Sequence, residues 1–224
     1  MADTLNNLGG LFRDNNRYAE AEKAVNSALG IIEKLSKQNP DTYLNYLAHT
    51  LNCLGMLYSD NKRYGEAEKA YNKTLEIREK LSKQNPDMYL QDLANNLLHI
   101  ANLYSVNNRY EAAEKAYNRA LEIYEKLSKQ NPDAYLHLFS DILNNLGILY
   151  KNNNQYEEAE KAYNKALEIR EKLARRNPDT YLSYLAHTLN SLGILYSDSI
   201  RYRDAEKAYN RALEIYIKLD KTES

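Results

Sequence analysis

The four prolines of the chain stand at one fixed spacing, and this spacing restricts the possible folds more than any other feature. They are separated by 46 residues each, and each lies within an Asn-Pro-Asp triplet: Pro40, Pro86, Pro132 and Pro178. A constant period of about 20–50 residues is typical of solenoids and propellers. The sequence therefore predicts one array over residues 1–224. Its units are 41–86, 87–132, 133–178 and 179–224, with a shortened unit at 1–40 before them.

The spacing of apolar residues within one unit distinguishes helices from strands. In the first half of 41–86 such residues recur every three or four positions, at Leu44, Leu47, Leu51, Leu54 and Tyr58. The second half keeps the same step through Ala67, Tyr71, Thr74, Arg78 and Leu81. Steps of three and four are typical of an amphipathic helix, whereas a half-buried strand alternates every second residue. Each unit is therefore predicted to hold two helices.

The segments between the predicted helices favour tight antiparallel hairpins. Residues 60–63, Asp-Asn-Lys-Arg, form a polar break that is too short for any other connection. The first helix of the unit begins at Asn39-Pro40-Asp41. Asparagine is a good N-cap, proline suits the first helical turn, and aspartate complements the positive end of the helix dipole. A hairpin with one apolar stripe per helix buries that stripe only by stacking on its neighbours, as in a solenoid.

The recurring small and aromatic residues resemble those of the tetratricopeptide repeat. The pattern is carried by Leu54-Gly55, Tyr58, Tyr64, Ala67 and Tyr71, and it returns at Leu146-Gly147, Tyr150, Tyr156, Ala159 and Tyr163. The unit is longer than the usual repeat of about 34 residues, and its long form is similar to kinesin-light-chain-type repeats. The resemblance implies an all-α fold, a right-handed superhelical α-solenoid of antiparallel helix hairpins. It also implies a protein-interaction scaffold.

One column of small residues indicates where two helices approach each other closely. It reads Gly9, Gly55, Ala101, Gly147 and Gly193. Glycine inside a helix costs about 1 kcal/mol relative to alanine, so a packing gain must offset it. Ala101 indicates that the column requires a small side chain and not a positive φ. We therefore expect these residues, and the tyrosines around them, to be core.

Three columns of the first helix differ most between units, and they form one stripe. They read Asp3/His49/Asn95/Asp141/His187, then Asn7/Cys53/His99/Asn145/Ser191, then Gly10/Met56/Asn102/Ile148/Ile194. At about 100° per residue, the three members in 41–86 fall within about 60° of each other. Leu51, Leu54 and Tyr58 lie on the opposite side of that helix. The stripe is therefore predicted to face away from the core.

The resemblance places this face on the inner, concave groove, where members of the family contact their ligands. Apolar residues beside Asn, His and Asp suit an extended or helical peptide. Along the stripe's edge runs a recurrent asparagine, at Asn6, Asn52, Asn144 and Asn190, with Leu98 as the exception, and amides can bond a peptide backbone. The predicted peptide-binding residues are Asn7, His49, Asn52, Cys53, Met56, Asn95, His99, Asn102, Asp141, Asn144, Asn145, Ile148, His187, Asn190, Ser191 and Ile194. Neutral drift of an unused surface is the alternative.

Several other functions find little support in the sequence. The net charge of −1 does not favour a nucleic-acid partner, and no apolar run suits a signal peptide or a membrane span. The single cysteine, Cys53, excludes an intrachain disulfide and favours a reducing, cytoplasmic setting. No catalytic or phosphate-binding motif is found, so we expect neither an enzyme nor a cofactor. His49, Cys53 and His99 are a weak metal motif without a fourth ligand, so no metal is predicted.

Two substitutions near the C-terminus add apolar surface. Ile200 stands where other units have Lys or Asn, and Ile217 stands where they have Glu. The stretch 220–224 adds no polar capping helix of the kind that usually ends a solenoid. The C-terminal face is therefore expected to meet another copy or another chain, unless the sequence is a segment of a longer array. A self-associating or designed structural scaffold with no specific ligand is the alternative function.

Overall fold

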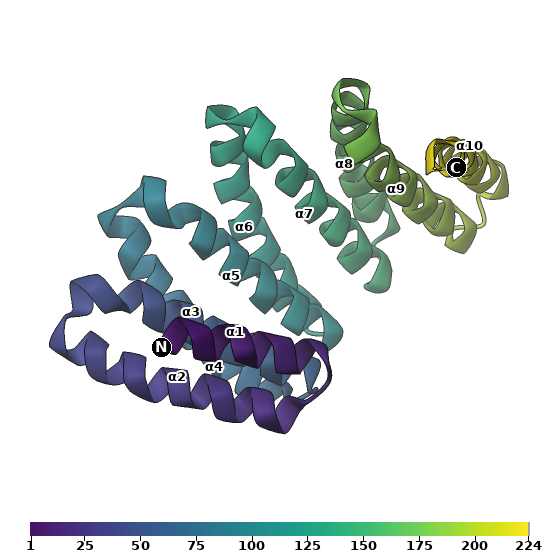
Figure 1. Cartoon of the computed structure of the whole chain (residues 1–224). Coiled ribbons are helices and arrows are strands. Elements are labelled where there is room, and N and C mark those ends of the chain that lie inside the picture. The colour runs from purple at the N-terminus through teal and green to yellow at the C-terminus, as the bar shows by residue number, and fades with distance from the viewer. Residues whose placement is uncertain (224) are drawn as a thin grey trace. The chain divides into compact units, whose positions relative to one another are not determined.

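The computed structural model describes residues 1–223, with side chains up to residue 220, and this part of the chain is built of antiparallel helical hairpins (Figure 1). Ten helices and no strand occur in the described part. They are α1 Ala2–Asp14, α2 Tyr18–Gln38, α3 Pro40–Asp60, α4 Tyr64–Gln84, α5 Pro86–Val106, α6 Tyr110–Gln130, α7 Pro132–Asn152, α8 Tyr156–Arg176, α9 Pro178–Asp198 and α10 Tyr202–Glu223. The predicted all-α solenoid of antiparallel hairpins is confirmed.

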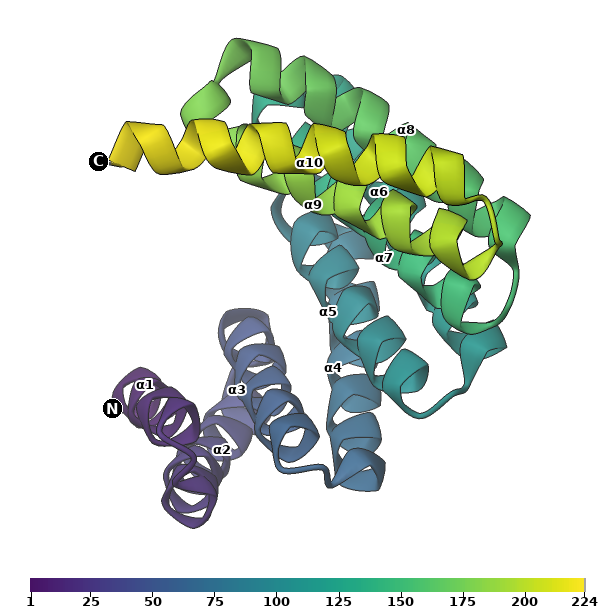
Figure 2. The same cartoon turned by 90° about the vertical axis from the view of Figure 1, so that its right-hand side faces the viewer.

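The chain divides into two compact units, Met1–Ala120 and Leu121–Ser224, with the boundary inside α6. In unit 1, α1 pairs with α2 and α3 with α4, while α2 packs on α3 and α4 on α5. In unit 2, α7 pairs with α8 and α9 with α10, while α8 packs on α9 (Figure 2). Within each unit, sequence neighbours are therefore also spatial neighbours. That the whole chain forms a single array stays a prediction.

The Asn-Pro-Asp triplets begin the long first helices as the sequence predicts. Proline opens α3, α5, α7 and α9, and the preceding asparagine is the N-cap in each case. The cap oxygen accepts a hydrogen bond from the backbone N–H three residues later, for example from Thr42 to Asn39 Oδ1 at 3.3 Å and from Ala134 to Asn131 Oδ1 at 3.2 Å. Each cap satisfies one of the N–H groups that a helix start leaves unpaired.

Glycine in the first helix permits close contact with a tyrosine of the second helix. A Cβ added to Gly55 would lie 2.4 Å from the ring of Tyr71, and one added to Gly147 would lie 2.6 Å from the ring of Tyr163. Both tyrosines are buried, with 2% and 1% of their surface exposed. No glycine in the described part has a positive φ. The requirement is for small size, as Ala101 indicates in the sequence.

A cluster of Glu, Tyr and Arg recurs between successive hairpins within each unit. In unit 1, Glu22 of α2 accepts bonds from Tyr58 Oη at 3.0 Å and from Arg63 Nη1 at 2.6 Å. The Arg63 guanidinium also lies 4.4 Å from the centre of the Tyr58 ring. Glu160, Tyr196 and Arg201 repeat this arrangement in unit 2. The cluster fixes the turn of one hairpin against the second helix of the preceding one.

Every turn inside a hairpin contains one residue in the left-handed region. These residues are Asn16, Lys62, Asn108, Asn154 and Ile200, with φ between 58° and 60°. Asparagine tolerates this conformation well, whereas a β-branched side chain collides with its own backbone there. Ile200 is therefore strained, and its side chain is 74% exposed, so it gains little from burial in the described part of the chain.

We expect Ile200→Asn to stabilise the protein by about 1 kcal/mol, because it relieves this strain without removing a buried contact. Urea unfolding of the two proteins measures the difference. The matched variant Asn154→Ile places the same side chain at the same turn position and is expected to cost about as much as Ile200→Asn gains. Equal stability of all three proteins would show that the turn is not strained.

Candidate functional site

All predicted peptide-binding residues lie on first helices, namely α1, α3, α5, α7 and α9, but their exposure differs. The exposed ones are Asn7, His49, Asn102, His187 and Ile194. The partly buried ones are Cys53, Met56, Asn95, His99, Asp141, Asn145, Ile148 and Asn190. The buried ones are Asn52, Asn144 and Ser191. Thus most of the predicted stripe is accessible on its own unit, while three of its members belong to the interior.

The recurrent asparagine on the edge of the stripe contacts the neighbouring first helix. Asn6 Nδ2 donates to Thr50 Oγ1 at 2.9 Å, and Asn144 Oδ1 accepts from Thr188 Oγ1 at 3.4 Å. Asn52 Nδ2 lies 3.4 Å from the sulfur of Met56. Asn6 and Asn144 thus join successive first helices of one unit, whereas the contact of Asn52 lies within α3. The exposed members of the stripe are therefore better placed to meet a ligand.

A cavity of about 170 Å³ in unit 1 brings part of the stripe together. Four of the predicted residues line it: His49, Asn52, Cys53 and Met56. The remaining lining comes from Gly9, Gly10, Arg13, Val25 and Leu57. His49 Nε2 lies 3.7 Å from Cys53 Sγ. The cavity has an apolar wall on one side and a guanidinium with an imidazole on another, and its volume is close to that of one large side chain.

The surroundings of this cavity carry positive charge. Burial, together with the nearby charges of Arg78 and Arg13, lowers the pKa of His99 to about 4. The His99 ring is stacked on the ring of Tyr71, with centres 5.5 Å apart and planes 5° apart. Burial also raises the pKa of the Cys53 thiol, although Arg13 and Arg78 oppose this shift. His99 and Cys53 are therefore neutral near pH 7, and the charge near them comes from the two arginines.

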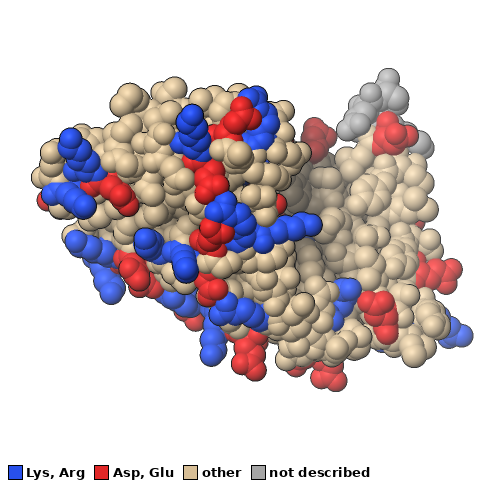
Figure 3. All heavy atoms as spheres, turned by 90° about the horizontal axis from the view of Figure 1, so that it is seen from below, with Lys and Arg blue, Asp and Glu red and all other residues tan. Residues whose placement is uncertain are grey.

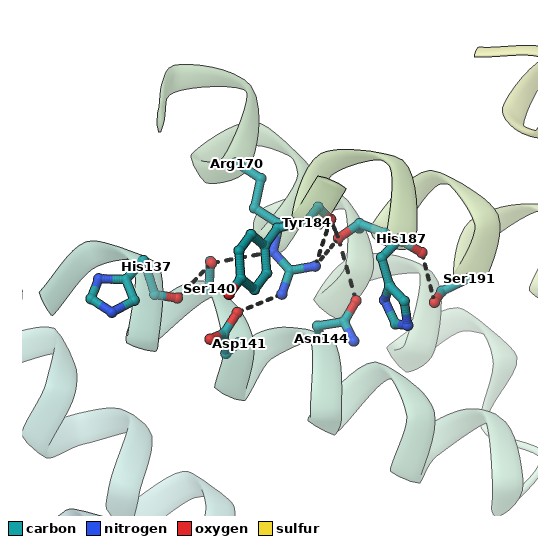
Figure 4. A network of polar contacts seen from close by, with 9 residues as sticks. His137, Ser140, Asp141, Asn144, Arg170, Tyr184, His187 and Ser191 are labelled. Carbon is teal, nitrogen blue, oxygen red and sulfur yellow. Dashed lines mark hydrogen bonds and ion pairs between the residues drawn. The ribbon is translucent and has the colours of Figure 1, made fainter. Parts of the chain in front are cut away.

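In unit 2 a polar network surrounds the buried guanidinium of Arg170 (Figure 4). Its Nη2 pairs with Asp141 Oδ1 at 2.6 Å, and its Nη1 donates to the backbone oxygen of Tyr184 at 2.9 Å. Nε lies 3.4 Å from Ser140 Oγ, and Nη1 also donates to Thr188 Oγ1. Of the predicted residues, Asp141 forms a direct bond to Arg170. The network leaves Arg170 with partners on all of its nitrogens.

A second cavity of about 170 Å³ adjoins this network. It is lined by His137, Ser140, Asp141, Arg170, Leu173, Thr180, Tyr181 and Tyr184. Ser140 Oγ donates to the backbone oxygen of His137 at 2.7 Å, and Asp141 is paired with Arg170. In a catalytic triad the serine bonds the histidine ring, and the ring bonds the aspartate. Here Ser140 bonds the backbone of His137 and Asp141 bonds Arg170, so these bonds do not form that arrangement.

The described residues contain neither a cluster of metal ligands nor a helix suited to a membrane. Among them, no group of three His, Cys, Asp or Glu side chains is close enough to hold a metal ion. Within the same part of the chain, no helix combines the length and the apolar character needed to cross a membrane. Figure 3 shows Lys and Arg interspersed with Asp and Glu on the face in view, with no large area of one sign.

Three arginines were missed as site residues by the sequence analysis. Arg13 lies one turn beyond the stripe, while Arg78 and Arg170 are on second helices and are buried, with 6% and 4% of their surface exposed. The sequence held one signal for Arg78, since it is a charged residue at a step of the apolar stripe. That signal was read as part of the core pattern.

Comparison with known proteins agrees with this architecture. The chain is similar to the crystal structure of BtubC (BKLC) from P. vanneervenii, with 25% identity and a TM-score of 0.80, over 97% of this chain and 80% of that one. A putative kinesin light chain from Podosopora anserina with nearly identical TPR-like repeats has 15% identity and a TM-score of 0.75, over 96% and 95% of the two chains.

The apo form of RapI has 20% identity and a TM-score of 0.75, over 98% of this chain and 72% of that one. No curated protein sequence matches the chain. The tetratricopeptide repeat profile matches residues 1–80, 46–126, 92–172 and 138–218, in steps of one 46-residue unit. With a match that extends over nearly all of its length, the chain belongs to the tetratricopeptide repeat family.

Proposed function

We propose that this chain is a protein-interaction scaffold that binds a peptide or a partner's helix along the first-helix stripe. Membership of the tetratricopeptide repeat family supports protein binding in general. The observation that carries the finer proposal is the cavity between α1 and α3, because it gathers His49, Cys53 and Met56 beside Arg13. We infer a role in binding without catalysis, and the free thiol of the single cysteine, Cys53, supports a cytoplasmic setting.

The stripe has the mixed chemistry that suits a peptide. Met56 and Ile148 are partly buried and Ile194 is 37% exposed, so each retains apolar surface that a partner can cover. His49, Asn102 and His187 are exposed next to them and can bond a backbone or a polar side chain. Selectivity would come from these differing side chains, since they are exposed or partly exposed whereas Asn52 and Asn144 are buried.

A selection from a displayed peptide library tests this proposal. One variant carries Asn102→Glu and Ile194→Glu, which add charge to exposed sites of the stripe in both units. The control carries Ser27→Glu and Asn164→Glu, which add two glutamates at exposed sites of second helices. We expect peptides selected on the unmodified protein to lose at least about tenfold in affinity on the first variant and to keep it on the control. Equal binding to both variants would contradict a site on the stripe.

A second candidate function, self-association, is favoured by the exposed face of α10. This face exposes three large apolar side chains: Leu213 at 56%, Tyr216 at 44% and Ile217 at 48%. One repeat earlier, Arg170 stands at the position of Tyr216, and it is only 4% exposed because α9 covers it. A second copy of the chain would supply the cover that α9 gives to α8. Light scattering is expected to show a mass that rises with concentration, and a strict monomer at high concentration would exclude this candidate.

A further inference from the structure

Two buried arginines occupy the same position in two different repeats, with different partners around them. Arg78 of α4 and Arg170 of α8 are two repeat lengths apart, and each donates from Nη1 to a backbone oxygen of the next first helix. The acceptor is Asp92 at 2.6 Å for Arg78 and Tyr184 at 2.9 Å for Arg170. Beyond this shared bond, the surroundings of the two guanidinium groups differ.

The side chains that satisfy Arg170 are replaced around Arg78. Ala48 stands at the repeat position of Ser140, so the hydroxyl that lies near Nε of Arg170 has no counterpart. His49 stands at the position of Asp141, so the carboxylate is also missing. Asn96 stands at the position of Thr188. Two of these substitutions thus remove an acceptor from Arg78, while Asn96 keeps an amide oxygen that forms no hydrogen bond.

The structure shows the consequence in unpaired buried atoms. Within the described part of the chain, Nε of Arg78 has no hydrogen-bond partner, and neither do Nδ2 and Oδ1 of Asn96, which is fully buried. A buried donor without an acceptor is costly, and for a charged donor the cost is larger. No described carboxylate forms an ion pair with Arg78. The side-chain carboxylate of Asp92 acts on Arg78 through its charge, without a hydrogen bond between the two side chains. This part of unit 1 therefore lacks an anionic acceptor.

From these observations, and resting on the proposed function, we propose that Arg78 receives the carboxylate of an aspartate or glutamate side chain from a bound peptide. In this arrangement the ligand supplies to Arg78 the group that Asp141 supplies to Arg170. A carboxylate is suitable because its two oxygens can accept from adjacent guanidinium nitrogens. The peptide chain beside it would lie on the stripe, and a neighbouring side chain would enter the cavity lined by His49, Cys53 and Met56.

Two arginines lie near this place, and they differ in their carboxylate partners. Arg78 and Arg13 both act on Cys53, which lies 3.7 Å from His49, so the two arginines, the thiol and the imidazole are close together. Arg13 is itself paired with Asp14 at 2.8 Å and with Asp60 at 3.4 Å. Asp92 offsets part of the charge of Arg78. Arg78 is thus the arginine of this pair that lacks a direct carboxylate partner, and a ligand carboxylate would supply one.

The test follows the side-chain Nε–H signal of Arg78 by NMR during titration with two blocked tripeptides, acetyl-Ala-Glu-Ala-amide and acetyl-Ala-Gln-Ala-amide. Arg78→Tyr identifies the signal, since Tyr124 occupies this position in another repeat. His49→Asp supplies an internal carboxylate at the position of Asp141. Sodium acetate and sodium chloride are titrated separately, to distinguish a peptide side chain from a free carboxylate and from ionic strength.

We expect the glutamate tripeptide to shift the Arg78 Nε–H signal saturably, with an affinity at least about tenfold higher than that of the glutamine tripeptide. His49→Asp is expected to abolish this difference in affinity. Acetate that binds as tightly as the glutamate tripeptide would overturn the assignment to a peptide side chain. An unchanged signal, or one that only follows ionic strength, would overturn the inference altogether. Library-selected peptides that bind the stripe equally well with glutamate or glutamine would also overturn it, while leaving the proposed function intact.

Discussion

Replacement of Gly55 by valine is expected to lower the free energy of unfolding by about 3 kcal/mol. The new Cβ would lie 2.4 Å from the buried ring of Tyr71, and the two methyl groups of valine add further volume at this close contact. Overpacking of this kind usually costs about 1–3 kcal/mol, and a β-branched residue in a helix adds a small further cost. Denaturant unfolding monitored by circular dichroism measures the change.

Gly30→Ala is the matched control for this prediction. Gly30 also lies inside a helix of unit 1, but a Cβ added there meets nothing within 4 Å. We expect this variant to be more stable than the unmodified protein by about 0.5–1 kcal/mol, since alanine is the better helix former. If Gly55→Val were as stable as the unmodified protein, the close approach of the first helix to Tyr71 would be refuted.

The second large effect is a loss of stability in acid that depends on His99. Its pKa in the folded protein is about 4, below the usual value of 6.5, because the ring is buried and lies near two arginines. The unfolded chain therefore binds the proton first as the pH falls. Stability from the neutral ring is fully present above pH 6.5 and declines between pH 6.5 and 4. A shift of this size corresponds to at most about 3 kcal/mol.

His99→Asn isolates this contribution from the other titrating groups. Asparagine stands at the same repeat position in Asn7 and Asn145, so it suits the local backbone and carries no charge. Urea unfolding at several pH values is expected to show the unmodified protein losing stability relative to His99→Asn as the pH falls from 6.5 to 4. Parallel curves for the two proteins over this range would contradict a neutral, buried His99.

The sequence predicts the architecture well because local signals repeat in register. The Asn-Pro-Asp triplets place the helix starts, and the apolar steps indicate helices. The Gly55 column predicts a close approach of two helices, which the structure shows at Tyr71. The left-handed turn position is harder to predict, since Lys62 and Ile200 stand there beside three asparagines. Their presence shows that a short connection between two packed helices determines the backbone even where the residue is unfavourable.

The candidate site is predicted less completely than the fold, because periodicity does not distinguish a partly covered face from an exposed one. Asn52 and Asn144 share the edge of the stripe with exposed residues, yet both are buried, and Asn144 bonds Thr188 of the next first helix. Arg78 and Arg170 follow an apolar step, and only the three-dimensional contacts show that one has a carboxylate partner. Such differences arise from pairs of residues far apart in the sequence, which single-helix patterns do not contain.

Methyl NMR of a peptide complex tests the central claim, that the first-helix stripe binds a peptide, most directly. Met56, Ile148 and Ile194 are methyl probes on the stripe, and Ile77 and Ile169 are matched probes on the second helices α4 and α8. With a library-selected peptide, we expect saturable shifts at one or more stripe methyls, while those of Ile77 and Ile169 stay unchanged. Saturable shifts confined to Ile77 and Ile169 would contradict the claim.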